Sequence, residues 1–266
     1  MIATRKGLFR AERRGPGDWR LAPGRPAFLG DEVSQVLPDR RTGRVYAALR
    51  HGHYGVKVHR SEDGGETFRE VAAPAYPERP TEPPDGEIDR APWSVLQIWA
   101  MAAGGPEQPD VLWAGDLPGG LFRSADAGES WQLNRPLWDR PERREWFGGG
   151  YKQPGLHSIV VDPRDAAKLL VGISVGGVWR TADGGASWEL SAAGMRAPYM
   201  PPALAAEPNV QDPHALAQCA AAPEIVWCQH HSGLYRSADG GKSWRGIVDP
   251  PPSFYGFPIA VHPLDP

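Results

Sequence analysis

The octapeptide "SADGGKSW" at residues 237–244 recurs in closely related form at three earlier places in this 266-residue chain. The related stretches are "SEDGGETF" at 61–68, "SADAGESW" at 124–131 and "TADGGASW" at 181–188. Successive copies start 56 to 63 residues apart. Self-similarity at such a period is typical of proteins built from repeated supersecondary units, so these eight residues decide the fold.

The residue types in the octapeptide predict a tight turn between two strands. Each copy holds one aspartate, at Asp63, Asp126, Asp183 and Asp239. An aspartate in a turn can accept hydrogen bonds from the backbone N–H groups two residues later, and a following glycine supplies the positive φ that a hairpin needs. The ring that ends each copy is large enough to pack between neighbouring repeats. We therefore interpret the octapeptide as a structural turn rather than a catalytic motif.

Segments that resemble strands surround every copy in the same order. Before the third copy come "HSIVV" at 157–161, the turn "DPRDAAK" at 162–168, "LLVGISV" at 169–175 and "GGVWR" at 176–180. A further strand starts at the aromatic residue of the octapeptide. Four antiparallel strands per repeat indicate the blade of a β-propeller. Since a single sheet of this size cannot bury both faces, neighbouring blades must stack.

The pattern S/T-x-D-x-G-x-S/T-W/F in these four copies resembles the Asp-box, also called the BNR repeat. Sialidases, sortilin-type receptors, xyloglucanases and photosystem assembly factors contain such repeats. The chain is most similar to bacterial BNR-repeat proteins described as sialidase-like or glycosyl-hydrolase-like. The resemblance implies an all-β propeller of four-stranded antiparallel blades. It implies no particular activity, because these families do unrelated things on the same ring.

We expect one propeller domain over residues 1–266. Its blades are predicted at 1–22 (partial), 31–73, 93–134, 156–191, 213–249 and 257–266 (partial). The last stretch, "FPIAVHPLDP", matches the inner strand and turn of a new blade. Relatives of this kind look like seven-bladed rings, so we expect a seven-bladed ring truncated at its C-terminus. A closed ring of five blades is the alternative.

Composition excludes several classes of function. A net charge of −3 and a pI near 6.2 argue against a broad surface for nucleic acid or anionic membranes. No apolar run approaches the roughly 18 residues that span a bilayer, and "MIATRKGLFR" lacks the apolar region of a secretory signal. Cys219 and Cys228 form neither a disulfide framework nor a zinc pattern. We expect a cytoplasmic protein without membrane or nucleic-acid partners.

The long connections predict which face of the propeller is functional. In a four-stranded antiparallel blade, the octapeptide turn shares one end with the turn between the first two strands. The connections between blades and between the second and third strands share the other end. The longest stretches, 72–93, 134–156 and 191–213, all fall in this second set. Loops of this length inside a domain are usually functional or disordered, so we expect a site opposite the octapeptides.

That face also collects polar and aromatic residues of the kinds that line small-ligand sites. The candidate ligand-binding residues are His51, His53, His157, His214, His230, His231, Arg50, Arg196, Tyr199, Asn209, Gln211 and Trp146. Imidazoles of "HGH" at 51–53 and "HH" at 230–231 are potential metal ligands. Zinc needs three or four converging ligands, however, and adjacent residues of a strand point to opposite faces. We therefore assign no metal site and expect no cofactor.

Three functions remain open. The first is binding of a carbohydrate or another polar small molecule, since tyrosine, tryptophan and histidine suit sugar hydroxyls and the apolar faces of sugar rings. The second is glycoside hydrolysis, which requires paired carboxylates; the candidates are Asp212, Glu87, Asp116 and Glu145. The Arg-Ile-Pro signature that the resemblance to sialidases would imply is absent. The third is a protein-docking scaffold with a broad, flat face.

Overall fold

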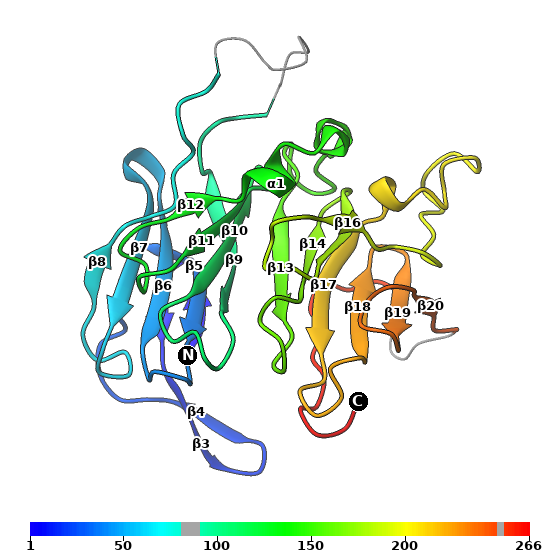
Figure 1. Cartoon of the computed structure of the whole chain (residues 1–266). Coiled ribbons are helices and arrows are strands. Elements are labelled where there is room, and N and C mark those ends of the chain that lie inside the picture. Colours follow the sequence, from blue (N-terminus) through cyan, green and yellow to red (C-terminus); the bar gives the residue numbers. More distant parts are fainter. Residues whose placement is uncertain (81–90, 249–252) are drawn as a thin grey trace.

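The structure, a computed structural model, describes residues 1–80, 91–248 and 253–266. Four sheets, each of four consecutive antiparallel strands, make up most of this part of the chain (Figure 1). In chain order their strands are β5 (Glu32–Pro38), β6 (Val45–His51), β7 (Gly55–Ser61), β8 (Arg69–Val71), β9 (Gln97–Ala103), β10 (Leu112–Leu117), β11 (Leu121–Ser124), β12 (Gln132–Leu133), β13 (Leu156–Val161), β14 (Leu169–Ile173), β15 (Gly177–Thr181), β16 (Glu189–Leu190), β17 (Pro213–Gln218), β18 (Val226–His230), β19 (Gly233–Ser237) and β20 (Arg245–Gly246). The predicted all-β propeller fold is confirmed.

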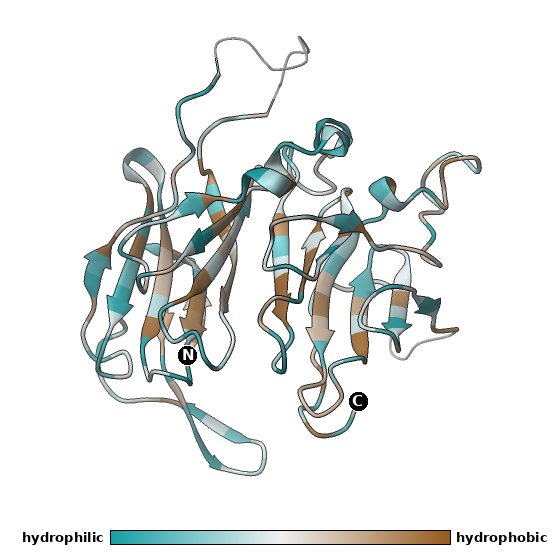
Figure 2. Cartoon of the chain, in the orientation of Figure 1, coloured by the Kyte–Doolittle hydropathy of each residue, from teal (hydrophilic) through white to brown (hydrophobic). Residues whose placement is uncertain are grey.

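The first strand of each sheet faces the first strand of the next. β5 packs against β9, β9 against β13, and β13 against β17. Apolar side chains fill the spaces between successive sheets, as with Trp113 of β10 and Trp179 of β15 in one shared cluster. Figure 2 shows hydrophobic residues concentrated in the strands and hydrophilic residues in the connections. Each sheet therefore buries its faces against its neighbours, as the repeat predicted.

Within the described residues, four short helices lie in connections at the end of the sheets opposite the octapeptides. They are α1 (Arg135–Trp138), η1 (Gly52–Tyr54), η2 (Pro141–Glu145) and η3 (Pro208–Val210). In Figure 1 the connections that carry α1 and η3 rise from the upper end of the molecule. No helix among the described residues has the length and apolarity to cross a membrane. We call this end the loop face and the other end the octapeptide face.

The N-terminal residues form a smaller unit beside β5. β1 (Ile2–Thr4) pairs with β2 (Gly7–Phe9), and β1 packs against β5. Leu8 exchanges two backbone hydrogen bonds with Ala27, which takes the place of a fourth strand. A Cβ atom at Gly7 would lie 2.9 Å from the Ala27 carbonyl oxygen, so only glycine permits this approach. The β3 (Ala11–Gly15) and β4 (Asp18–Leu21) hairpin projects where later sheets have an octapeptide (Figure 1).

The inner strand predicted at 257–266 is not formed. Within this stretch the backbone makes one isolated bridge, between His262 and Asp265, which closes the expected turn. The Ala221 N–H donates to the carbonyl of Pro263, so this turn rests on the turn between β17 and β18. A strand requires a hydrogen-bonded neighbour, and no described segment pairs with 257–261. The number of blades in a complete ring stays a prediction.

Each of the four octapeptides contains the same pattern of internal hydrogen bonds. In the third copy, Thr181 Oγ1 donates to Asp183 Oδ1 at 2.7 Å and accepts from the Gly185 N–H at 3.0 Å. Asp183 also accepts from the Ser187 N–H at 2.9 Å and from its hydroxyl. These hydrogen bonds, led by the one from the Ser187 hydroxyl, lower the pKa of Asp183 to about 2. In every copy the aspartate thus accepts from the residue four positions later, not two as predicted.

The aromatic residue of each octapeptide packs against the preceding sheet, as predicted. The indole of Trp131 donates to the Ala72 carbonyl just after β8, at 2.9 Å. The indole of Trp244 donates to the Ser191 carbonyl just after β16, at 2.7 Å. Phe68 lies 4.9 Å from the ring of Phe28 in the N-terminal unit. Each octapeptide therefore both turns its own sheet and joins it to the sheet before.

Candidate functional site

Each inner strand carries a β-bulge near its beginning, on the loop-face side. In β13, Leu156 pairs with Ile173 and Ser158 with Gly172, so His157 has no partner. The registers of the other three inner strands skip one residue in the same way, at Ser34, Trp99 and His214. A bulge bends the strand and re-aims the extra side chain. Trp99, His157 and His214 therefore occupy equivalent positions on three successive inner strands.

Two of these re-aimed side chains, Trp99 and His157, are linked by a ring contact. The Trp99 ring lies 6.2 Å from His157 and 5.2 Å from Tyr151, both in edge-on arrangements. The Nε2 atom of His157 is buried without a hydrogen-bond partner. Burial lowers the pKa of His157 to about 4, so this imidazole is neutral at physiological pH. It contributes shape and apolar surface rather than charge.

Asp212 stands immediately before β17 and is 3% exposed. Its Oδ1 atom accepts from the Val175 N–H at 3.2 Å. Its Oδ2 atom lies 3.4 Å from His214 Nε2 and 3.4 Å from His231 Nδ1. Burial alone would raise the pKa of Asp212, but the hydrogen bond and charge of His214 outweigh it and hold the pKa below its ordinary value. Asp212 correspondingly raises the pKa of His214 against the effect of burial.

The neighbouring histidines 230 and 231 have different roles because they point to opposite sides of the chain. His230 is fully buried, and its Nε2 and Nδ1 atoms each lie 3.0 Å from a backbone nitrogen, those of Asp212 and Ser232. A neutral imidazole has one accepting nitrogen, so only one of these contacts is a hydrogen bond at a time. Burial lowers the pKa of His230 to about 4. His230 therefore positions the backbone of Asp212, whereas His231 faces its carboxylate.

Aromatic rings surround the two histidines that face Asp212. Phe257 stacks on His214 with centroids 4.7 Å apart and planes 13° apart. Tyr255 meets both histidines edge-on at 5.6 and 5.4 Å, and Tyr199 meets His231 at 5.0 Å. The three rings are 42 to 61% exposed. We call the set of Asp212, His214, His231, Tyr199, Tyr255 and Phe257 the aromatic-histidine cluster.

Several predicted ligand-binding residues instead fasten the long connections together. The Trp146 indole donates to Asn209 Oδ1 at 2.8 Å, and Asn209 Nδ2 donates to Glu145 Oε2 at 2.9 Å and to a backbone carbonyl. Gln211 is fully buried and donates to the carbonyls of Ala205 and Glu207. The contacts of Asn209 join the connection that carries η2 to the one that carries η3, whereas those of Gln211 lie within the connection that carries η3. Arg196 is exposed on the same connection, and its backbone contacts the hydroxyl of Tyr235.

Arg50, His51 and His53 lie on the β5–β8 sheet rather than at the cluster. Arg50 is 3.9 Å from Glu32, and His51 is 3.6 Å from Asp31. His51 lines a separate hollow with Tyr54, and the exposed His53 contacts the Tyr54 ring. Of the predicted residues, the structure therefore brings together Tyr199, Asp212, His214 and His231. The "HGH" segment at 51–53 lies outside this cluster.

The other carboxylates proposed for hydrolysis are placed differently. Asp116 is fully buried, and its Oδ1 atom accepts from the Tyr76 hydroxyl at 3.0 Å. Burial raises the pKa of Asp116 well above its ordinary value, although the hydrogen bond from Tyr76 acts in the opposite direction. Glu145 is bonded to Asn209. Glu87 lies outside the described residues.

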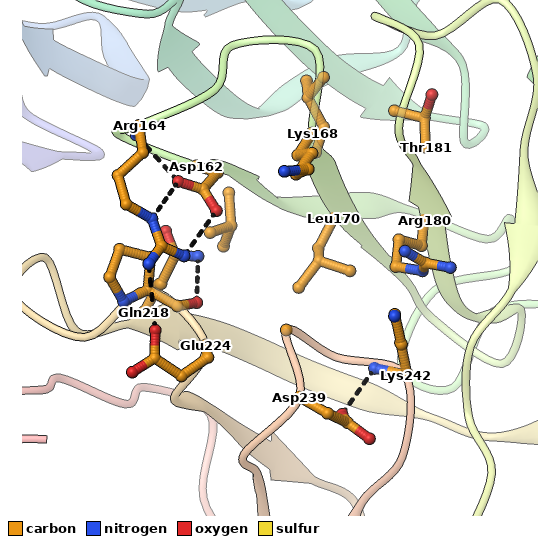
Figure 3. A pocket seen from close by; sticks show the side chains of 14 residues that line it. Asp162, Arg164, Lys168, Leu170, Arg180, Thr181, Gln218, Glu224, Asp239 and Lys242 are labelled. Atoms are coloured by element: carbon orange, nitrogen blue, oxygen red, sulfur yellow. Dashed lines mark hydrogen bonds and ion pairs between the residues drawn. The ribbon is translucent and has the colours of Figure 1, made fainter.

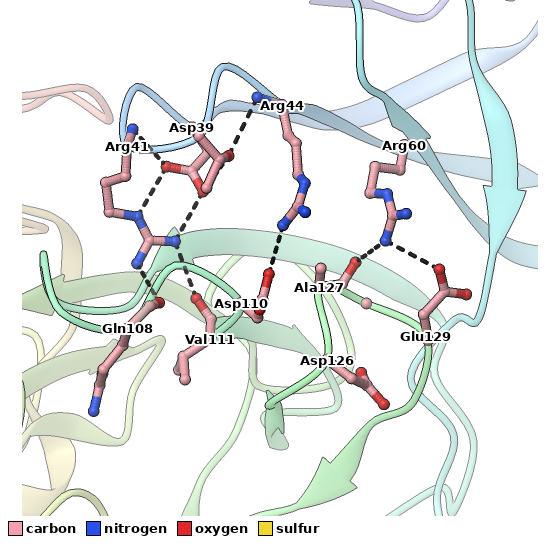
Figure 4. Close-up of polar contacts among 12 residues, drawn as sticks. Asp39, Arg41, Arg44, Arg60, Gln108, Asp110, Val111, Asp126, Ala127 and Glu129 are labelled. Carbon is pink, nitrogen blue, oxygen red and sulfur yellow. Dashed lines mark hydrogen bonds and ion pairs between the residues drawn. The ribbon is translucent and has the colours of Figure 1, made fainter.

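The octapeptide face holds a polar hollow of about 230 Å³ between the third and fourth sheets (Figure 3). Three of its charged residues pair with one another, since Arg164 lies 3.2 Å from both Asp162 and Glu224. At the equivalent place between the first two sheets, Arg41 binds Asp39 and donates to three carbonyls of the next sheet (Figure 4). The polar groups of this face thus connect successive sheets.

Sequence reasoning missed Trp99, Tyr255 and Phe257. The signal for Trp99 was its position in "IWAMA", which corresponds to that of His157 in "LHSIV". For Tyr255 and Phe257 the signal was the aromatic group in "PPSFYGF", which follows the last octapeptide on the loop-face side. Neither signal shows from sequence alone that Trp99 meets His157 or that Tyr255 and Phe257 meet His214.

Comparison with known proteins finds local and fold-level similarity. No family model matches the chain. Over 85 residues, 32% of the chain, it is 33% identical to an oligoxyloglucan-reducing end-specific xyloglucanase of Emericella nidulans, of which the match covers 9%. An ancestral GH74 enzyme superposes with a TM-score of 0.55 and 18% identity, covering 82% of this chain and 24% of that one.

A second solved structure shares the fold. The extracellular domain of a putative hybrid two-component system from B. thetaiotaomicron gives a TM-score of 0.52 at 10% identity, covering 94% of this chain and 26% of that one. The chain thus spans about a quarter of the length of these two solved chains. At these identities the likeness shows the propeller fold alone.

Proposed function

We propose that the protein binds a carbohydrate on its loop face, at the aromatic-histidine cluster. The observation that carries this proposal is the position of three exposed rings, Tyr199, Tyr255 and Phe257, around a buried carboxylate–imidazole pair. Aromatic faces pack against the apolar faces of sugar rings, and carboxylates and imidazoles bond hydroxyl groups. A few placed polar groups among apolar walls are typical of small-ligand sites.

Two further observations support a carbohydrate rather than another polar ligand. The 85-residue similarity is to a xyloglucanase, a protein whose name describes action on a polysaccharide. The four octapeptides follow the S/T-x-D-x-G-x-S/T-W/F pattern that resembles the Asp-box, and we propose that the chain is a glycosyl-hydrolase-like member of that class. β-Glucan oligosaccharides, including xyloglucan fragments, are therefore the first ligands to test.

We propose binding rather than hydrolysis. Glycoside hydrolysis generally needs two carboxyl groups roughly 5 to 10 Å apart across the scissile bond. Asp116 is enclosed with Tyr76, and Glu145 is bonded to Asn209. Among the candidate carboxylates that the structure describes, which do not include Glu87, Asp212 is the one that faces the rings. A protein-docking scaffold would instead present a broad, flat face without a buried charged pair.

The test is calorimetric titration of the full chain with a panel of xyloglucan, cellulose and sialylated oligosaccharides. Tyr255→Ala and Tyr199→Ala should each weaken binding at least fivefold, because each removes an exposed ring at the cluster. Tyr54→Ala is the matched control, since Tyr54 is 78% exposed but lies on the β5–β8 sheet. Failure of every oligosaccharide to bind, or equal binding by all three variants, would overturn the proposal. Release of reducing ends during incubation would favour the hydrolase instead.

A further inference from the structure

Three ligand atoms converge within the aromatic-histidine cluster. Asp212 Oδ2, His214 Nε2 and His231 Nδ1 all lie within 4.8 Å of one another. The two distances from the carboxylate oxygen are both 3.4 Å. The sequence suggested the pairs "HGH" and "HH" as sources of imidazole, but the structure combines one histidine from 230–231 with one from β17. The three residues come from the start of one strand and from the link after the next.

The spacing fits a tetrahedral metal ion. Zinc lies about 2.0 to 2.2 Å from imidazole nitrogen and carboxylate oxygen. Two ligands of a tetrahedral ion at about 2.1 Å are separated by about 3.4 Å, which equals the distance from Asp212 Oδ2 to each imidazole nitrogen. The His231 side chain is 42% exposed. Its ring can therefore rotate to bring Nδ1 to the same separation from His214 Nε2.

The surroundings orient two of the ligands. His214 Nδ1 lies 2.7 Å from the carbonyl oxygen of Gly256, which can only accept, so Nδ1 carries the proton and Nε2 presents its lone pair to Asp212. Metal-binding histidines typically donate their second N–H to a carbonyl or carboxylate in this way. The Val175 N–H occupies Asp212 Oδ1 and leaves Oδ2 as the coordinating atom. Stacking on Phe257 fixes the His214 ring.

Two facing acceptors, the Nε2 lone pair and the carboxylate oxygen, repel each other unless a cation lies between them. A proton on His214 Nε2 is one such cation, and a divalent metal ion is the other. Gly149 lies beside this carboxylate oxygen: a Cβ atom at residue 149 would lie 3.1 Å from Asp212 Oδ2, a tighter contact than side chains ordinarily make.

We propose that Asp212, His214 and His231 bind one divalent metal ion, with Zn²⁺ as the best match. Two imidazoles and one carboxylate are a common zinc ligand set when a fourth position stays open for water or a ligand oxygen. This inference does not depend on carbohydrate binding, because the metal alone is the probe.

The experiment titrates Zn²⁺ into metal-free full-length protein by calorimetry. We expect one equivalent to bind, and Asp212→Asn and His231→Ala each to weaken affinity at least tenfold. Asp212→Asn keeps an oxygen that can accept from the Val175 N–H, so it preserves the local backbone contact. His53→Ala, which removes an exposed histidine on the β5–β8 sheet, should leave the affinity unchanged.

Gly149→Ala provides a variant that alters no ligand. Its new methyl group should weaken Zn²⁺ binding by crowding the space beside Asp212 Oδ2. Substitution by Co²⁺ adds a spectroscopic check, because tetrahedral coordination gives intense visible absorption that six-coordinate Co²⁺ lacks. Absence of saturable binding would overturn the proposal. So would binding that Asp212→Asn and His231→Ala leave within twofold of wild type, since the ion would then sit elsewhere on the surface.

Discussion

The indole of Trp188 donates a 2.9 Å hydrogen bond to the side-chain oxygen of Asn134, the residue that precedes α1. The same oxygen accepts from the Leu137 N–H at 3.1 Å and caps α1. Asn134 Nδ2 donates to the Gly185 carbonyl at 2.8 Å. One asparagine thus joins the exit of the second sheet to the octapeptide of the third. At other sheet boundaries a backbone carbonyl accepts the corresponding indole N–H.

Replacement of Asn134 by alanine should destabilise the protein by about 2 to 3 kcal/mol. The variant loses a helix cap and leaves the Gly185 carbonyl and the Trp188 indole without their partners. Urea unfolding measures the change. Trp188→Phe removes only the indole donor, so the double variant should lose less than the sum of the two single losses. Strict additivity would contradict the direct link between these residues.

The second octapeptide contains a strained residue. Ala127 has a φ of 58°, whereas the other three copies have glycine at this position, each with φ of 72°. Because alanine costs about 1 to 2 kcal/mol in the left-handed region, Ala127→Gly should stabilise the protein by up to about 1 kcal/mol after loss of a buried methyl group. Thermal unfolding would report the gain.

Gly184→Ala is the converse substitution, made at the equivalent position of the third octapeptide. No atom lies within 4 Å of a Cβ at residue 184, so backbone strain is the only expected cost. This variant should lose about 1 kcal/mol. A stabilising Gly184→Ala, or a destabilising Ala127→Gly of similar size, would show that the left-handed strain is not the deciding term.

Asp116 should make the protein less stable as pH rises. Burial raises the pKa of its carboxyl well above the ordinary value, so the folded state keeps a proton that the unfolded chain releases above about pH 4. The free energy of unfolding should then fall with increasing pH by at most about 1.4 kcal/mol per pH unit from this group. Asp116→Asn removes the titration, so its unfolding free energy should depend less on pH. Parallel pH profiles for the two proteins would contradict the assignment.

The titration of His157 should instead make the protein more stable as pH rises. Its pKa is about 4 in the folded state because of burial, against about 6.5 when unfolded, so the unfolded chain takes up a proton first. The contribution is fully present above pH 6.5 and is lost as pH falls toward 4, by at most about 3 kcal/mol. His157→Asn should flatten the profile over this range, measured by urea unfolding at several pH values. Burial also lowers the pKa of His230 to about 4, so part of the pH dependence of the unfolding free energy should remain in this variant. An unchanged slope in the variant would show that His157 titrates normally.

The sequence predicted the strand order because the chemistry of the octapeptide is local. A hydroxyl, an aspartate, glycines with positive φ and a ring lie within eight residues, and four spaced copies imply four similar sheets. The roles of loop residues were harder to predict. Asn209 and Gln211 suit a sugar ligand by type, but in the structure Asn209 joins two neighbouring connections and Gln211 stabilises its own connection. Polar groups that satisfy a loop and those that bind a ligand have the same composition.

The sequence by itself determined the repeat, the turns and the face on which the long connections gather, because those depend on residues close together in the chain. Tertiary structure alone decided that Asp212, His214 and His231 meet, and that Tyr255 and Phe257 stand beside them. A bulge in β17 re-aims His214, and the tight link after β18 sends His230 inward and His231 toward Asp212. Such distances follow from sheet twist and packing between separate blades, which no local pattern of residues encodes.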